Sequence, residues 1–167
     1  MKKMLLLMLI PLLGIAQTPK SLTVNDYLAA KAEKKQLHLK AIQKAINYQN
    51  INRNYFEYKP LVFDEELTKE AQNWAHYLSI INEAKHSTTK DKKGELIFYA
   101  PKDWFKDSTD LMTHASVFWV LSDDNVDKAT TEQILCENCD KVGFGIASSR
   151  DTYYVVAKYN KMPKFSN

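Results

Sequence analysis

Two side chains that can do chemistry, His86 and Glu95, lie nine positions apart in the segment KHSTTKDKKGEL, residues 85–96. An imidazole and a carboxylate can together move protons or help to hold a divalent metal such as zinc. The residues between them are polar or charged, with no apolar anchor until Leu96, so two solvated loop residues are the alternative interpretation. The choice depends on what the rest of the chain brings near them.

The other histidines offer little support for a catalytic motif. The chain has four histidines, and no two of them have the H-E-x-x-H spacing of a metalloprotease helix. His38 and His76 fall in helical patterns, where a surface or boundary position is expected, and His114 precedes an apolar run and predicts helix packing. No G-x-S-x-G, Walker or dinucleotide-binding pattern is present, so the motifs favour no enzyme class.

Cys136 and Cys139 form a C-x-x-C motif near the end of the chain. A redox motif of the thioredoxin type follows a strand and opens a helix, whereas this one precedes a predicted hairpin and encloses an acidic residue. A zinc site would need two more ligands of a matching type. In an exported protein a local disulfide is favoured over redox catalysis.

The first 16 residues have the three parts of a secretory signal peptide: two lysines, an apolar run, and small residues before a cleavage point after about Ala16. The apolar run is shorter than the roughly 20 residues of a membrane-spanning helix, so no membrane span is predicted. The net charge of +3 includes Lys2 and Lys3, so the mature chain is nearly neutral and no nucleic acid partner is expected. The expected location is secreted or periplasmic.

Helical patterns occupy the first two-thirds of the chain. Residues 26–50 predict one or two helices, weakened by the Asn-rich stretch NYQNINRN. The clearest helix is residues 64–81, where Asp64 is a good N-cap and apolar residues recur every three or four positions. A third helix is predicted from Ser108 or Thr109 to about residue 121, with Phe118 on its apolar side.

Strand patterns come later. The segment ELIFYA, residues 95–100, predicts a strand, and KVGFGIAS and TYYVVAKY around SSRD predict a hairpin. Helices followed by a hairpin indicate an α+β fold with helices covering an antiparallel sheet.

The order of these features resembles the CAP superfamily, which comprises the cysteine-rich secretory, antigen 5 and pathogenesis-related 1 proteins. The pieces that carry the resemblance are LVFDEELTKEAQNWAHYLSI, KHS, GEL, FWVLSD, EQILCENCDKVGFGIA and YYVVAKYNKMP. The resemblance implies a three-layer α-β-α sandwich with a central antiparallel sheet. It divides the chain into the signal peptide at 1–16, an N-terminal helical extension at 17–39 and the CAP domain at 40–167.

The resemblance also implies a cleft tetrad of two histidines and two glutamates, of which this chain keeps half. His86 matches the first histidine and Glu95 the first glutamate, whereas Ser122 and Thr130 stand at the positions of the other two. Two ligands are far fewer than the four of a structural zinc site, so no cofactor is expected beyond weak binding of a divalent metal such as zinc at His86 and Glu95. The metal affinity should stay weak unless Asp123, Asp124 or Glu132 replaces the missing ligands, and no catalytic residue is assigned.

The expected function is therefore a secreted, non-enzymatic CAP-type binding module. As the resemblance implies, its partner would be a small apolar ligand of the lipid or sterol type, or a protein. The candidate groove residues are the aromatics Phe98, Tyr99, Trp104 and Phe105, for which core packing is the alternative interpretation. Two other functions remain open: a weak metal-dependent hydrolase that uses His86 and Glu95, and an envelope structural or interaction protein that uses the Lys-rich segment 31–44 as a partner helix.

Overall fold

The computed structural model describes residues 23–88, 93–121 and 124–163. For residues 124–127 it describes the backbone alone. The order of elements is α1 (Val24–Tyr55), β1 (Val62–Phe63), α2 (Glu65–Ile81), β2 (Gly94–Pro101), the short 3-10 helix η1 (Lys102–Trp104), α3 (Leu111–Leu121), α4 (Asp124–Ile134), β3 (Lys141–Ser148) and β4 (Thr152–Tyr159). The predicted signal peptide and Ser122 lie outside the described residues.

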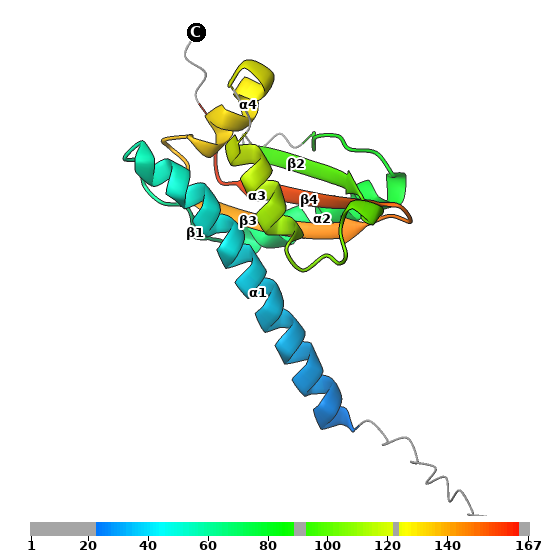
Figure 1. Ribbon diagram of the computed structural model, residues 1–167. Helices are drawn as coiled ribbons and strands as arrows, with labels where there is room; N and C mark the ends of the chain where they lie inside the picture. The colour runs from blue at the N-terminus through cyan, green and yellow to red at the C-terminus, as the bar shows by residue number, and fades with distance from the viewer. Residues whose placement is uncertain (1–22, 89–92, 122–123, 164–167) are drawn as a thin grey trace, which may run out of the picture.

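A four-stranded sheet forms the middle layer, in the order β1-β3-β4-β2. The three long strands are antiparallel, as predicted, whereas the two-residue β1 pairs with β3 in parallel, so the complete sheet is mixed. Figure 1 shows α1 and α3 in front of the sheet and α2 behind it. The predicted α+β class and the three-layer α-β-α sandwich are thereby confirmed.

Alternation along the strands divides the core into two parts. Val155, Ala157 and Tyr159 of β4 pack with α1 and α3, whereas Tyr154 and Val156 pack with α2 on the opposite face. Lys158 follows the same alternation and lies on the α2 face of the sheet. The alternation of side chains along β4 therefore places Lys158 on the same side of the sheet as α2.

The helix α2 begins and ends as its sequence predicts. The Asp64 carboxylate accepts a hydrogen bond from the backbone N–H of Leu67, and Asn82 ends the helix in the left-handed conformation. Gly143 of β3 lets the helix approach closely, because a Cβ at this position would lie 2.1 Å from the backbone nitrogen of Thr68. The close packing fixes the first turn of α2 against the sheet.

The helix α1 is one continuous helix of 32 residues, so the expected weakening at NYQNINRN was wrong. The polar residues there make tertiary hydrogen bonds: Asn50 donates to the carbonyl of Leu61 at 2.9 Å and accepts from its N–H at 2.7 Å. Arg53, in the last turn, is buried. These contacts outweigh the low helix propensity of asparagine.

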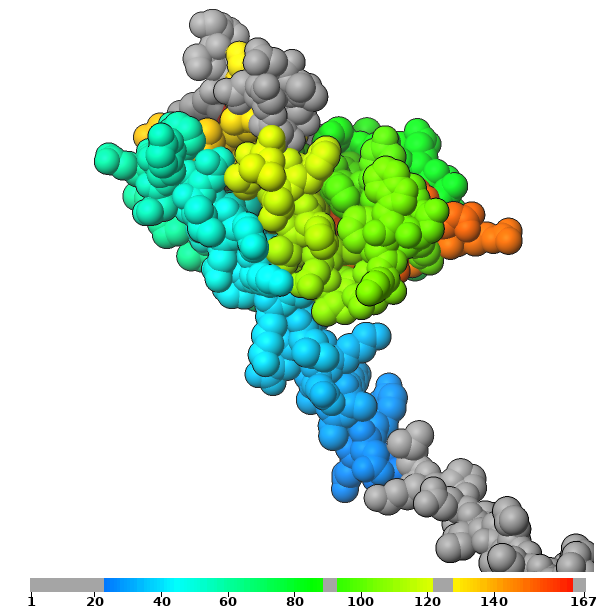
Figure 2. All heavy atoms as spheres, viewed as in Figure 1, coloured from blue at the N-terminus to red at the C-terminus, as the bar shows by residue number. Residues whose placement is uncertain are grey.

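The first half of α1 projects beyond the body of the domain, as Figures 1 and 2 show in blue. Residues 24–37 are all exposed, and the buried residues of this helix begin at Ile42. The first half of the Lys-rich segment 31–44 lies on this projecting part, whereas Lys44, at its end, pairs with Asp110 at 2.8 Å.

Two helices differ from the sequence-based expectation. The helix α3 begins at Leu111, three residues after Ser108, and Phe118 is exposed instead of packing in the core. The helix α4 was not predicted, because its sequence DNVDKATTEQI is almost entirely polar. Its last turn is held by tertiary contacts, since Ile134 is buried and the Gln133 amide donates to the carbonyl of Lys161 at 3.3 Å.

Candidate functional site

A buried ion pair joins Glu95 of β2 to Lys158 of β4. The two residues are direct cross-strand partners in the antiparallel register, so their side chains share the α2 face of the sheet. Lys158 Nζ lies 2.5 Å from Glu95 Oε2, and the two side chains are only 4% and 6% exposed. The charge of Glu95 is therefore neutralised inside the protein.

The segment after α2 completes the shell around Glu95. The backbone N–H of Ser87 donates to Oε1 at 2.8 Å, and the Ser87 hydroxyl donates to Oε2 at 2.9 Å. His86 Nδ1 lies 2.9 Å from Oε1 and donates to it in the tautomer that carries the proton on Nδ1. Both carboxylate oxygens thus accept hydrogen bonds, and the predicted proximity of His86 and Glu95 is present in the structure.

This cluster holds Glu95 in its ionised form. Burial alone would raise the pKa of Glu95, but hydrogen bonds from His86, Lys158 and Ser87 outweigh it and lower the pKa from its ordinary value of 4.5 to about 2. The Lys158 ammonium also donates to the Ser87 hydroxyl. Ser87 therefore bridges the two charged side chains, since its hydroxyl accepts from Lys158 and donates to Glu95.

The lowered pKa of Glu95 predicts a pH dependence of stability. The unfolded chain binds a proton at Glu95 more readily than the folded chain, so the stabilisation is complete above pH 4.5 and is lost as the pH falls toward about 2. Thermal unfolding of the wild type and of Glu95→Gln across this range should show a steeper loss for the wild type. Equal slopes would contradict the assigned hydrogen bonds.

Of the other positions that the resemblance singles out, the structure describes Thr130, which is buried on α4. Ser122 and Asp123 lie outside the described residues, as does the side chain of Asp124. Glu132 lies 3.4 Å from Lys128, one turn earlier on α4. Among the described side chains, no group of three or more His, Cys, Asp and Glu residues is placed to hold a metal ion.

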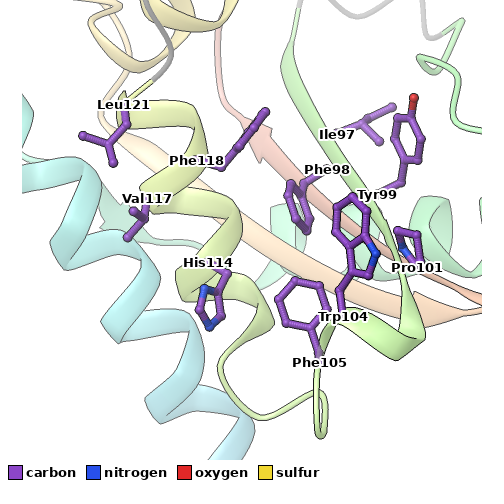
Figure 3. Close-up of a pocket in the computed structure, with 10 residues that line it drawn as sticks. All are labelled: Ile97, Phe98, Tyr99, Pro101, Trp104, Phe105, His114, Val117, Phe118 and Leu121. Carbon is purple, nitrogen blue, oxygen red and sulfur yellow. The ribbon is translucent and has the colours of Figure 1, made fainter.

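A second feature is an apolar groove of about 970 Å³ between β2 and α3. All four aromatics singled out in the sequence line it, and Figure 3 shows them with the residues of α3 that form the opposite wall. The lining residues are Ile97, Phe98, Tyr99, Pro101, Trp104, Phe105, His114, Val117, Phe118 and Leu121. Figure 2 shows a hollow between α3 and the green segment that carries β2.

Sequence reasoning missed the α3 wall of this groove. His114, Val117, Phe118 and Leu121 recur at helical spacing, which is the signal of a continuous apolar stripe, but the stripe faces outward and not into the core. Phe118 packs against Phe98 with ring centroids 5.6 Å apart, and His114 lies 5.4 Å from the ring of Phe105. The two walls therefore contact each other through these two ring pairs.

The two cysteines form a disulfide, as the sequence favoured. The loop that they close is anchored by Arg53 of α1, whose Nη1 donates to the carbonyl of Cys136 at 3.0 Å and whose Nη2 donates to that of Cys139 at 2.9 Å. Both cysteines are buried. The contacts of the motif are those of a structural bridge.

Comparisons with known proteins agree with this architecture. Among solved structures, NaASP2 with Zn²⁺ matches with a TM-score of 0.59 and 20% identity, covering 73% of this chain and 82% of that one. Schistosoma mansoni venom allergen-like protein 4 matches with a TM-score of 0.53 and 13% identity, covering 75% and 90%. Manganese-bound Ac-ASP-7 matches with a TM-score of 0.53 and 16% identity, covering 74% and 70%.

These identities establish a shared fold and no more. Among curated proteins, no sequence matches this chain. In the described part of the chain, no helix is both long and apolar enough to cross a membrane. The sequence model of CAP, described as the cysteine-rich secretory protein family, matches residues 46–159, from the buried half of α1 to the end of β4. That match covers most of the chain and every element that builds the site, so the protein belongs to the CAP family.

Proposed function

We propose that this CAP protein is an exported, non-enzymatic binding module, and that the groove between β2 and α3 receives a small apolar ligand of the lipid or sterol type. The observation that carries the proposal is the exposure of large apolar side chains along the groove. Trp104 is 73% exposed and Phe118 is 59% exposed, together with Tyr99 and Leu121. A contiguous exposed apolar patch of this kind usually marks a binding site.

The size and shape of the groove favour a small elongated ligand. Its volume of about 970 Å³ falls at the upper end of the range of small-molecule sites, roughly 300–1,000 Å³. Three consecutive residues of β2, Ile97, Phe98 and Tyr99, line it although their side chains alternate between the two faces of the sheet. The groove therefore follows the edge of β2, which is the edge strand of the sheet.

The shell of Glu95 supports the non-enzymatic part of the proposal. A general base needs a lone pair within reach of a substrate proton, whereas both oxygens of Glu95 already accept hydrogen bonds and its side chain is buried. His86 is 70% exposed but is oriented by the same carboxylate. The hydrolase alternative would require this shell to open.

Fluorescence of Trp104 tests the groove directly. Trp119 is buried and Trp74 donates to the carbonyl of Lys85, so Trp104 is the tryptophan that a ligand in the groove would cover. We expect a saturable blue shift when a long-chain fatty acid or a sterol is added. Phe118→Asp, which keeps Trp104, should weaken binding by about tenfold or more because it places a charge in the apolar wall.

The matched control is Ile80→Asp. Ile80 is 68% exposed on α2, behind the sheet, so it is as accessible as Phe118 but lies away from the groove. It should leave the titration unchanged. If neither ligand class shifts the emission, or if both variants weaken binding equally, the small-ligand proposal is wrong; a shift produced only by apolar peptides would point to a protein partner that adds to the edge of β2.

A further inference from the structure

The donor set around Glu95 does not fit a divalent metal, although two structures of the same fold are described with zinc and with manganese. A zinc site in a protein uses at least three protein ligands, and structural sites use four. The described residues here supply one carboxylate and one imidazole, and no third group of the same kind joins them. Among the described residues, the partner that neutralises the buried carboxylate is instead the ammonium of Lys158.

We infer that the ammonium of Lys158 takes the place of a divalent cation beside Glu95, so that this CAP domain stabilises its cleft without a metal. The position of Nζ carries the inference. It lies 2.5 Å from Glu95 Oε2 and also contacts the Ser87 hydroxyl, so it meets oxygen ligands as a bound cation would.

The sheet itself holds Lys158 beside Glu95. Its side chain rises from the middle layer of the fold, directly opposite Glu95 in the sheet, and is only 4% exposed. An ammonium has three donors and no acceptor, so it can replace the charge of a metal but cannot ligate one. A divalent ion that approached Glu95 would meet the positive charge of Lys158 and would have to displace it.

Ser87 has a second role under this inference. Its hydroxyl accepts from Lys158 and donates to Glu95 Oε2, and its N–H holds Oε1, so it fixes the carboxylate toward the ammonium. His86 and Ser87, which follow α2, thus hold Glu95 in position for its ion pair with Lys158. The inference is independent of what the apolar groove binds.

Zinc titration of chelator-treated protein by calorimetry tests the inference, with thermal unfolding as the second readout. The wild type should show no binding tighter than the weak level of scattered surface histidines, and a chelator should leave its melting temperature unchanged. Lys158→Met should bind zinc at least about tenfold more tightly, because Glu95 becomes available. The added Glu95→Gln substitution should abolish that gain.

Two controls keep the test decisive. Lys69→Met removes an exposed lysine that pairs with Glu66 at 2.6 Å, and should leave zinc binding unchanged. If Lys158→Met does not fold, Lys158→Gln keeps a hydrogen-bond donor beside Glu95 without the charge and should show the same direction. Micromolar or tighter zinc binding by the wild type that Glu95→Gln removes would overturn the inference, as would a lysine variant that binds no more tightly.

Discussion

Lys158→Met should lower the free energy of unfolding by about 3–5 kcal/mol, because it leaves the buried carboxylate of Glu95 without its charged partner. Methionine has a similar length and fills the space of the lysine stem, so the loss reports the ion pair and not a cavity. Both side chains are nearly fully buried, and Glu95 Oε2 would keep only the hydroxyl of Ser87 among its observed donors. Urea unfolding at neutral pH measures the difference.

Two further variants separate this loss from an ordinary salt-bridge effect. Glu95→Gln combined with Lys158→Met removes both charges and should recover much of the stability, because a neutral pair carries no uncompensated charge. Lys69→Met breaks an exposed ion pair and should cost less than about 1 kcal/mol. A similar small cost for Lys158→Met would show that the Glu95 cluster is not a stabilising unit.

The sequence predicts the elements whose apolar residues recur regularly or whose ends carry a clear helix cap. The helix that follows Asp64 has both, and its bounds agree with the structure to within a residue. The helix α4 has only three apolar residues among its eleven, so little in the sequence marks its buried side, and it is defined by contacts of Gln133 and Ile134 with other parts of the chain. Such contacts depend on the tertiary arrangement, which no local pattern shows.

The site was predicted in part, for a related reason. His86 and Glu95 were found through their types and spacing together with the family resemblance, and the structure places them 2.9 Å apart. The sequence places Lys158 in the predicted strand TYYVVAKY and indicates no partner for it. Its one signal is a charge inside an apolar strand, and its partner depends on the register between β2 and β4, which the pattern of β4 alone does not show.

Arg53 is the other buried charge that the sequence concealed, since it stands in an Asn-rich stretch that resembles a fraying helix end. In the structure it is fully buried and its guanidinium reaches four backbone carbonyls. Nη1 donates to Ile134 at 2.6 Å and to Cys136 at 3.0 Å, Nη2 donates to Cys139 at 2.9 Å, and Nε donates to Lys59 at 2.9 Å. One side chain thus joins the end of α1 to the end of α4 and to the disulfide loop.

Arg53→Met should therefore cost about 4 kcal/mol or more, because each buried carbonyl left without a donor costs about 1–3 kcal/mol. The expected local effect is more specific than the loss of stability. Without the guanidinium the loop of Cys136 and Cys139 loses the donors to its two cysteine carbonyls, so dithiothreitol should reduce the disulfide faster than in the wild type under native conditions. Urea unfolding and timed thiol alkylation measure the two effects.

Arg53→Lys and Arg150→Met are the matched comparisons. Lysine keeps the positive charge but lacks the planar fork that reaches four carbonyls, so Arg53→Lys should still destabilise the protein and expose the disulfide, to a smaller extent. Arg150 is almost fully exposed in the β3–β4 turn, and its replacement should change neither measurement. If Arg53→Lys behaved like the wild type, the charge of Arg53 and not its four hydrogen bonds would hold the loop, because hydrogen-bond geometry is the property that distinguishes the two side chains.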